Sequence, residues 1–257
     1  MEYRPNTTVK NIRKRKRRAA PIFGLWLFLL FCCFLAAYFF LNSAYFSVVH
    51  FEVSGSFLLP AEEVLNLSGL NPGANIFKLD TREAVTKIET HPYIKKAAIT
   101  RKLPQTLLIN VEERFARAFV LGKGEFLIVD PEGIILEKTT ELKERTYPII
   151  SGVSLKEGPL PGENILTPGL KAALALVDIL DEKFLSNVSE IVAATPESMI
   201  LKTKQGVQIR FGPPEDLERK ISLIRELLFD HGTIINDQTV EYIDLRYDTA
   251  PVIKRKK

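Results

Sequence analysis

The chain of 257 residues carries 35 lysine and arginine residues against 31 aspartate and glutamate residues, which gives a formal net charge of +4. This positive charge is concentrated at the two ends, since residues 1–20 sum to +7 and residues 254–257 to +4, which leaves −7 for the stretch between them. A mildly acidic body without a basic face argues against a nucleic-acid-binding protein.

An uncharged segment near the N-terminus predicts a membrane-spanning helix. Residues 19–51 contain no Asp, Glu, Lys or Arg, and residues 21–41 are almost wholly apolar. At about 1.5 Å per residue, a helix of this length crosses the roughly 30 Å of hydrocarbon in a bilayer. We therefore predict a transmembrane helix over residues 21–42. Cys32 and Cys33 both lie within it, and adjacent cysteines rarely satisfy disulfide geometry, so the rest of the chain depends on its core for stability.

The charges that flank this helix indicate its orientation. A block of six cations directly precedes the predicted helix, whereas the first charged residue after the helix is an acid, Glu52. Because positively charged flanks stay in the cytoplasm, we expect residues 1–20 to be a cytoplasmic basic tail and the large remainder to lie outside the cytoplasmic membrane. A cleaved signal peptide is the alternative, but its apolar region would be shorter, and residues 42–44 form a poor cleavage site. The predicted topology signal comprises Arg13, Lys14, Arg15, Lys16, Arg17 and Arg18.

Residues 46–114 show the pattern of a small module with the order β-α-α-β-β. Apolar and polar residues alternate over residues 49–54, as in a half-buried strand, and Gly55 ends this pattern. Asp80 is placed to cap the second helix. The module begins within five residues of the predicted span, so we expect it close to the membrane surface. The other elements expected in the module are a helix at 60–65, strands at 97–103 and 106–112, and a turn at 103–105.

Residues 115–257 predict a mostly antiparallel β domain with two longer helices. A type I turn at Asp130-Pro-Glu-Gly133 joins two strands of a meander. Residues 151–162 are rich in glycine and proline, which is typical of a loop. The strands expected before the last one cover residues 116–121, 125–129, 134–137, 188–193, 199–203 and 207–211.

The two helices and the end of the chain complete this domain. Thr167 is placed to cap the first helix, whereas Pro213-Pro214 is expected to open the second. Residues 240–245 predict a final strand, and a short extended tail follows at Val252-Ile253. The fold class is therefore α+β, with an N-terminal transmembrane helix, a β-α-α-β-β domain and a β domain. The first helix is expected to bury Leu170, Leu174, Val177 and Leu180, and the second Leu217, Ile221, Ile224 and Leu228.

Motifs for cell-wall chemistry do not occur in the sequence. No lysine completes the S-x-x-K spacing of penicillin-binding acyl transferases, and G-x-S-x-G is absent. His50, His91 and His231 lie far apart and lack a partner four residues away, so no helical zinc site is encoded. Asp181 and Glu182 lack the facing counterpart that glycoside hydrolysis requires. We therefore expect no catalytic residues, no metal and no cofactor.

Short motifs follow one another along the body in a fixed order. They are Val49-His-Phe-Glu-Val-Ser-Gly55, Gly73-Ala-Asn-Ile-Phe77, His91-Pro-Tyr-Ile94, Ala98-Ile-Thr-Arg-Lys-Leu-Pro104, Ile109-Asn-Val-Glu-Glu-Arg114, Ile128-Val-Asp-Pro-Glu-Gly133, Tyr147-Pro-Ile-Ile-Ser-Gly152 and Ile243-Asp-Leu-Arg-Tyr247. This ordered set, behind a basic tail and one span, resembles the FtsQ/DivIB cell division family and covers nearly the whole chain. The resemblance implies that residues 46–114 are a POTRA domain and residues 115–257 the family's β domain with a C-terminal tail.

The resemblance also implies a function, namely a scaffold at the division septum without catalytic activity. In this family the protein joins two small bitopic partners, FtsB (DivIC) and FtsL, and the C-terminal part of the β domain binds the partner. Strand addition at an exposed sheet edge suits such binding, because unpaired backbone groups supply affinity and alternate side chains supply selectivity. We expect the contacts to be Tyr242, Leu245, Arg246 and Tyr247 with the following tail. Ordinary packing of a last strand is the alternative for Tyr242 and Leu245.

Two other classes of function compete with a division scaffold. POTRA modules also serve in export and outer-membrane assembly, although they commonly occur there in tandem. A membrane-anchored cell-wall enzyme is the other alternative, which the missing motifs weaken. Depletion of the protein separates the three, since a division scaffold gives filaments, an export component gives secretion defects, and a wall enzyme gives altered wall fragments.

Overall fold

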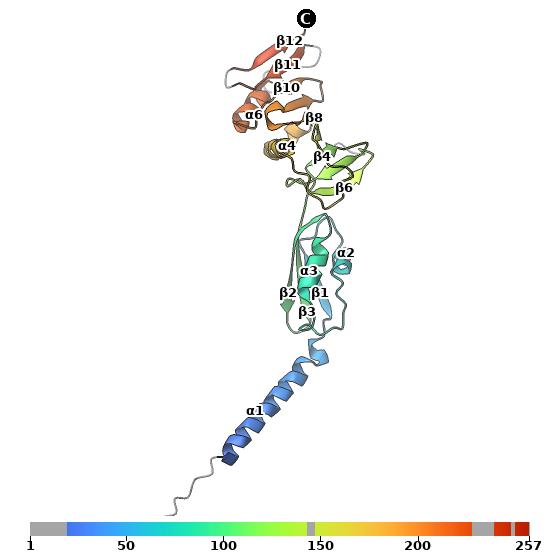
Figure 1. The fold of residues 1–257 in the computed structure, drawn as a ribbon, viewed down its shortest axis with the longest axis vertical. Helices are drawn as coiled ribbons and strands as arrows, with labels where there is room; N and C mark the ends of the chain where they lie inside the picture. Colours follow the sequence, from blue (N-terminus) through green and yellow to red (C-terminus); the bar gives the residue numbers. More distant parts are fainter. Residues whose placement is uncertain (1–19, 143–146, 228–238, 248–249, 257) are drawn as a thin grey trace, which may run out of the picture. The chain divides into compact units, whose positions relative to one another are not determined.

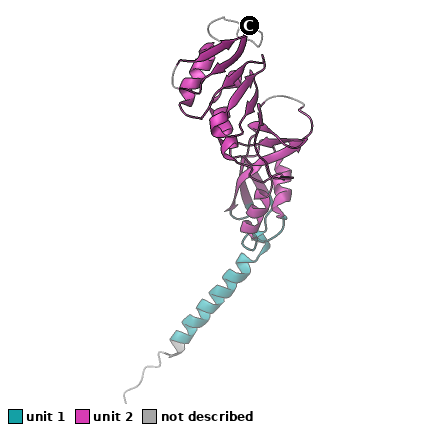
Figure 2. Ribbon diagram, turned by 45° about the horizontal axis from the view of Figure 1, so that its top comes forward, with its two compact units in different colours: residues 1–50, 71–79, 102–106 teal, residues 51–70, 80–101, 107–257 magenta. Residues whose placement is uncertain are grey.

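The computed structural model describes residues 20–142, 147–227, 239–247 and 250–256 (Figure 1). Along the chain it contains an N-terminal apolar helix, a β-α-α-β-β module and a β-rich domain, which confirms the predicted α+β class. The chain divides into two compact units (Figure 2). The first comprises residues 1–50, 71–79 and 102–106, and the second comprises residues 51–70, 80–101 and 107–257.

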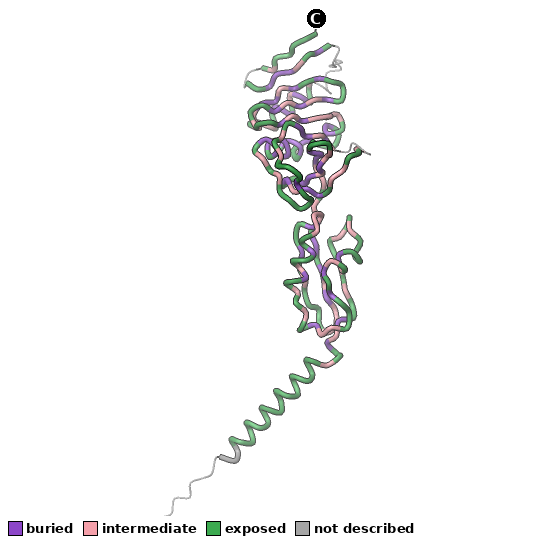
Figure 3. Tube along the Cα trace, turned by 45° about the vertical axis from the view of Figure 1, so that its right-hand side comes forward, coloured by how far each residue is buried: buried purple, intermediate pink, exposed green. Residues whose placement is uncertain are grey.

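Helix α1 (Ala20–Leu41) is apolar on all sides. Its side chains from Phe23 to Leu41 are exposed along their whole length, as the continuous green of this helix shows in Figure 3. The helix is long and apolar enough to cross a membrane. Such a surface is unfavourable in water and suits hydrocarbon, where a helix also satisfies its own backbone hydrogen bonds. The basic block at residues 13–18 lies outside the described residues.

The β-α-α-β-β module forms a three-stranded sheet with the strand order β1-β3-β2. Val64 and Ile88, one from each helix, are fully buried with Ile109 of the middle strand. Strand β3 is last in the chain but central in the sheet, and both helices pack against the same apolar face of this sheet. The elements are β1 (His50–Ser54), α2 (Ala61–Ser68), α3 (Thr81–Glu89), β2 (Ile94–Lys102) and β3 (Thr106–Glu113), preceded by a short 3-10 helix, η1 (Ala44–Phe46).

The N-terminus of α3 is capped as its sequence predicts. The Asp80 side chain accepts hydrogen bonds from the backbone N–H groups of Arg82 and Glu83, both at 3.0 Å. These bonds satisfy two of the donors that the first turn of a helix leaves without a partner. The two hydrogen bonds also hold the pKa of the Asp80 carboxyl below its ordinary value.

A buried carboxylate at the end of β3 fixes the loop that follows β1. The oxygens of Glu113 accept the backbone N–H groups of Phe57, Leu58 and Leu59 at 2.8 to 3.0 Å. Burial raises the pKa of Glu113, but the hydrogen bonds together outweigh it and hold this pKa below its ordinary value. The loop is thereby ordered although the side chains of Phe57 and Leu58 are exposed to solvent.

In the β domain the described strands form one nine-stranded sheet in the order β12-β11-β10-β9-β8-β7-β4-β5-β6. Neighbouring strands are mostly antiparallel, whereas β4–β7, β7–β8 and β10–β11 pair in parallel. The strands are β4 (Ala118–Leu121), β5 (Phe126–Val129), β6 (Ile135–Thr139), β7 (Ile149–Ser151), β8 (Val188–Val192), β9 (Ile200–Thr203), β10 (Gln208–Arg210), β11 (Val240–Asp244) and β12 (Val252–Arg255). The helices are α4 (Pro168–Ile179), α5 (Glu182–Leu185), α6 (Leu217–Arg225) and a 3-10 turn, η2 (Pro196–Ser198).

Helix α4 packs its predicted stripe into the core of this domain. Thr167 accepts a hydrogen bond from the N–H of Leu170 at 3.3 Å, which confirms the predicted cap. The helix also approaches a strand end closely, because a Cβ atom at Gly169 would lie 2.1 Å from the carbonyl oxygen of Ala193. The stripe residues Leu170, Leu174, Val177 and Leu180 are all buried.

Strand β7 lies where no strand is predicted. It has only three residues, between Pro148 and Gly152, and pairs in parallel with β4 on one side and β8 on the other. Neither neighbour is close in the sequence, so no local pattern marks this strand. Its position joins the β4–β6 meander and the β8–β12 strands into one sheet.

Helix α6 begins later than its sequence predicts. Pro213-Pro214 precede the helix, which starts at Leu217. Asp216 in front of it has a φ of 49°, in the left-handed region, so the chain before Leu217 does not continue the helix. Ile221 and Ile224 are buried as predicted, and Leu217 packs partly buried against the core. Leu228 lies outside the described residues.

Candidate partner-binding surface

The residues predicted as a short extended tail form an edge strand of the β domain, β12 (Val252–Arg255). Strand β12 pairs antiparallel with β11, with Ile253 opposite Ile243 and Lys254 opposite Tyr242. Among the described residues it is the terminal strand in the sheet order (Figure 1), and all four of its residues are exposed. The open edge of the sheet at this end therefore belongs to β12 and not to β11.

The alternation of backbone groups shows which residues of β12 face outward. The N–H of Leu245 donates to the carbonyl of Arg210 on β10, so the backbone groups of Tyr242 and Asp244 face β12. The N–H groups of their β12 partners, Val252 and Lys254, consequently point inward. The N–H groups of Ile253 and Arg255 then point to the open side, as unpaired edges do.

Tyr242 lies beneath two cations on one face of this edge. The guanidinium carbon of Arg210 is 3.8 Å from the Tyr242 ring centroid, and the Nζ atom of Lys254 is 5.5 Å away. Lys254 also forms an ion pair with Glu241 at 2.9 Å. The three strands β10, β11 and β12 thus contribute to a single aromatic and cationic cluster. Tyr242 is half-buried in it.

The other three predicted contact residues divide between core and surface. Leu245 is only 3% exposed and packs in the main core. This position agrees with ordinary packing of a last strand, the alternative to a partner contact. Tyr247 is 65% exposed, and the guanidinium of Arg246 lies 5.5 Å from its ring. The structure therefore brings Arg246 and Tyr247 together on the surface.

Asp244 orients Arg246, and it was not among the predicted contact residues. Its carboxylate forms a two-point contact with Arg246, from Nε to Oδ1 at 2.9 Å and from Nη2 to Oδ2 at 2.7 Å. These bonds hold the pKa of the Asp244 carboxyl below its ordinary value of 3.8. Asp244 lies on the predicted strand 240–245 and Arg246 directly follows it, so their i, i+2 spacing was a usable signal, since it places residues of an extended chain on one face. Arg210 had no such signal, because it reaches Tyr242 only through the parallel pairing of β10 and β11.

Asp244→Asn should destabilise the protein in a pH-dependent way. A carboxyl whose pKa is depressed on folding contributes stability above its unfolded pKa, and this stability is lost as the pH falls through the folded value. The difference in unfolding free energy between the parent and Asp244→Asn should therefore be largest near neutral pH and should shrink below about pH 3.8. Urea unfolding at several pH values measures it, and a difference that does not change with pH would contradict the assignment.

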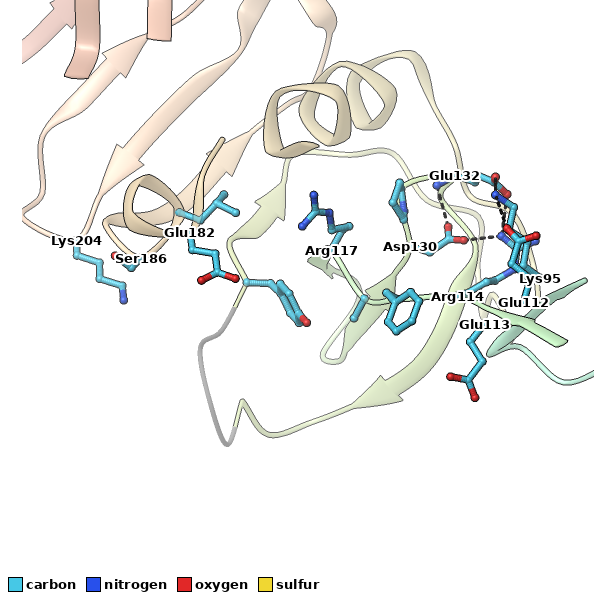
Figure 4. A pocket seen from close by; sticks show the side chains of 15 residues that line it. Lys95, Glu112, Glu113, Arg114, Arg117, Asp130, Glu132, Glu182, Ser186 and Lys204 are labelled. Carbon is cyan, nitrogen blue, oxygen red and sulfur yellow. Dashed lines mark hydrogen bonds and ion pairs between the residues drawn. The ribbon is translucent and has the colours of Figure 1, made fainter. Parts of the chain in front are cut away.

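A pocket of about 940 Å³ in the second compact unit is the other candidate site (Figure 4). Five of its charged lining residues contact one another, namely Lys95, Glu112, Arg114, Asp130 and Glu132. Arg114 forms ion pairs with Asp130 at 2.5 Å and with Glu132 at 2.8 Å, and Lys95 forms one with Glu132 at 2.7 Å. A hydrogen bond from Lys95, which has the larger effect, and another from Arg114 hold the pKa of Glu132 below its ordinary value. These five residues form a structural ion-pair network, in which acids and bases neutralise each other.

An apolar helix long enough to cross a membrane, a β-α-α-β-β module and a nine-stranded sheet among the described residues together define the class of POTRA-containing proteins with a candidate membrane span. Residues 46–114 match the family model "POTRA domain, FtsQ-type", and residues 118–246 match "Cell division protein FtsQ/DivIB, C-terminal". The chain belongs to the FtsQ/DivIB family of cell division proteins. These descriptions favour division over export as the process in which it takes part.

Individual relatives extend over most of the chain. The cell division protein FtsQ of Syntrophotalea carbinolica is 30% identical over 82% of this chain and 75% of its own length. DivIB of Clostridium botulinum strain Hall is 25% identical over 96% of this chain and 95% of its own length. A solved extracytoplasmic domain of DivIB from Geobacillus stearothermophilus aligns with 46% of this chain and 95% of its own length, at 18% identity and a TM-score of 0.32. The family assignment does not depend on this last similarity.

Proposed function

We propose that this protein is a bitopic scaffold of the division machinery that binds FtsB/DivIC-like and FtsL-like proteins at the septum and catalyses no reaction. In this proposal residues 1–20 are cytoplasmic, residues 21–42 span the cytoplasmic membrane, and the POTRA domain (46–114) and β domain (115–257) lie outside. Support for the orientation comes from the six cations at residues 13–18. Support for the division role comes from family membership.

The open edge of β12 is the observation that carries partner binding. All four of its residues are exposed, and nothing among the described residues pairs with its outer side. An extended partner segment can add a strand here and satisfy the outward backbone groups of Ile253 and Arg255. The cluster around Tyr242, together with Arg246 and Tyr247, provides the side chains beside that edge. Aromatic and arginine residues are the types that dominate binding energy at protein interfaces.

Ile253→Pro tests this mode of binding. Proline removes the outward N–H of residue 253 and leaves the inward N–H groups of Val252 and Lys254 in place, so β12 should still pair with β11. We expect the affinity for the FtsB/DivIC-like protein of the same organism to fall by about 10- to 100-fold, which corresponds to one lost hydrogen bond and a steric clash. Binding of the purified full-length chains in detergent measures the change.

Ile253→Val is the matched control, because it changes the side chain and keeps the backbone donor. It should bind within about threefold of the parent, since removal of one methylene on an exposed strand has a small effect. Equal affinities of the proline and valine variants would exclude strand addition at β12. Failure of the parent chain to bind either small division protein would contradict the scaffold role itself.

A further inference from the structure

The membrane-proximal end of the POTRA domain carries exposed apolar side chains that are built onto the end of α1. They belong to three segments of one compact unit, namely residues 41–50, 71–79 and 102–106. Water-exposed apolar side chains in such a group need an apolar partner. The members are Tyr45, Val49, Phe77 and Leu103, and we call them the juxtamembrane patch.

Hydrogen bonds connect the end of α1 directly to these segments. The side-chain amide of Asn75 donates to the carbonyl of Leu41, the last residue of the helix, at 2.7 Å. The N–H of Ile76 donates to the carbonyl of Phe46 at 2.8 Å, and the N–H of Val49 donates to the carbonyl of Gln105 at 2.9 Å. The loops at residues 71–79 and 102–106 are therefore held against the chain within a few residues of the helix end.

Aromatic rings continue the apolar surface of the helix into the module. Phe40 in the last turn of α1 is 5.2 Å from Phe46, and Phe46 is 5.1 Å from Phe77, measured between ring centroids. Tyr45 stacks on Phe40 at 5.9 Å. The interfacial layer of a bilayer adds about 5 to 8 Å beyond the hydrocarbon on each side, so rings this close to the helix end fall within its reach.

The charge of these segments suits a lipid surface. Residues 20–50, 71–79 and 102–106 contain no aspartate or glutamate, whereas Lys78 and Lys102 are exposed next to Phe77 and Leu103. Carboxylates would be repelled by anionic headgroups, and lysines beside apolar side chains are attracted to them. Aromatic and lysine side chains are also the types that accumulate at the membrane–water interface.

We infer that the juxtamembrane patch lies in the headgroup layer of the membrane that α1 crosses, so that the loops at 71–79 and 102–106 are a second membrane contact of the protein. The partner of this patch is the lipid surface, because the patch continues the apolar surface of α1, the helix that enters the membrane. This inference rests on the proposed membrane insertion of α1. It adds a contact made by the POTRA domain itself.

Depth-dependent quenching of a fluorescent label tests the contact. The full-length chain, with Cys32 and Cys33 replaced by alanine, would carry one label at Leu103→Cys or at Lys78→Cys, both exposed positions. It would be reconstituted into vesicles of phosphatidylglycerol and phosphatidylethanolamine with a nitroxide either at the headgroup or deep in the acyl chain. We expect the headgroup nitroxide to lower the label fluorescence about twofold or more, and more than the deep nitroxide does.

A label at Tyr38→Cys, one turn before the end of α1, separates the two ways in which the test can fail. Quenching at residue 38 with none at residues 103 and 78 would overturn the lipid contact and leave the anchor standing. No lipid quenching at any of the three positions would show that α1 is not inserted, which would overturn the proposed anchoring and this inference together.

Discussion

Gly55→Ala should lower the free energy of unfolding by about 3 kcal/mol or more. Gly55 has a φ of 79°, in the left-handed region, and a Cβ atom there would lie 2.1 Å from the carbonyl oxygen of Val111 on β3. The substitution therefore combines backbone strain with a clash against a neighbouring strand, and backbone cannot move aside as a flexible side chain can. Urea unfolding of the detergent-solubilised chain, followed by circular dichroism, measures the loss.

Gly73→Ala is the matched control within the same module. Gly73 also has a positive φ, of 88°, but a Cβ atom at this position would have no neighbouring atom within 4 Å. This variant should lose only the left-handed strain, about 1 kcal/mol. Equal losses for the two variants would show that the contact with Val111 is unimportant and that the backbone conformation alone explains the effect.

Arg114→Ala should destabilise the second compact unit by about 3 kcal/mol. Asp130 is 2% exposed, and its Oδ2 atom accepts from Arg114 while its Oδ1 atom accepts the N–H groups of Glu132 and Ile134. Removal of the guanidinium leaves the buried Asp130 carboxylate without its countercharge. This lowers the free energy of unfolding more than the loss of both members of the ion pair would. Thermal and urea unfolding of the full chain both measure the change.

Lys123→Ala provides the comparison for this variant. Lys123 forms an equally short ion pair with Glu157 at 2.6 Å, but the two side chains are 82% and 87% exposed. Exposed pairs contribute little, so this substitution should change the stability by less than about 0.5 kcal/mol. Similar effects of the Arg114 and Lys123 substitutions would mean that burial at Asp130 does not strengthen the interaction.

Local chemistry made much of the fold predictable. Asp80 and Thr167 are short polar residues in front of apolar periodic stretches, and both cap the expected helices. The β-α-α-β-β order follows in the same way from alternation, caps and turns along a single stretch of chain. In each case the decisive contacts lie within a few residues of one another, so the sequence pattern contains them.

Pairing between distant segments was the part that could not be predicted. Strand β7 has three residues and derives its place from two parallel neighbours. The later start of α6 has a different and local cause, the left-handed backbone at Asp216. At the candidate surface, Tyr242 is half-buried against side chains of β10 and β12, Arg246 is exposed, and Leu245 is buried in the core. The predicted contact residues remain a prediction until binding is measured.

The place of β7 in the sheet also sets an order of events during synthesis. Phe119 pairs with Ile149, 30 residues later, and Ile150 pairs with Ile191, 41 residues later. The last strand of the POTRA domain ends at Glu113. In contrast, one edge of β4 stays unpaired until β7 has been synthesised, and one edge of β7 stays unpaired until β8 has been synthesised. Long-range parallel pairing is slow, and N-terminal domains form first as a chain emerges. A nascent chain therefore passes through a stage in which the POTRA domain is complete and strands β4, β5 and β6 are present without β7, their neighbour in the sheet.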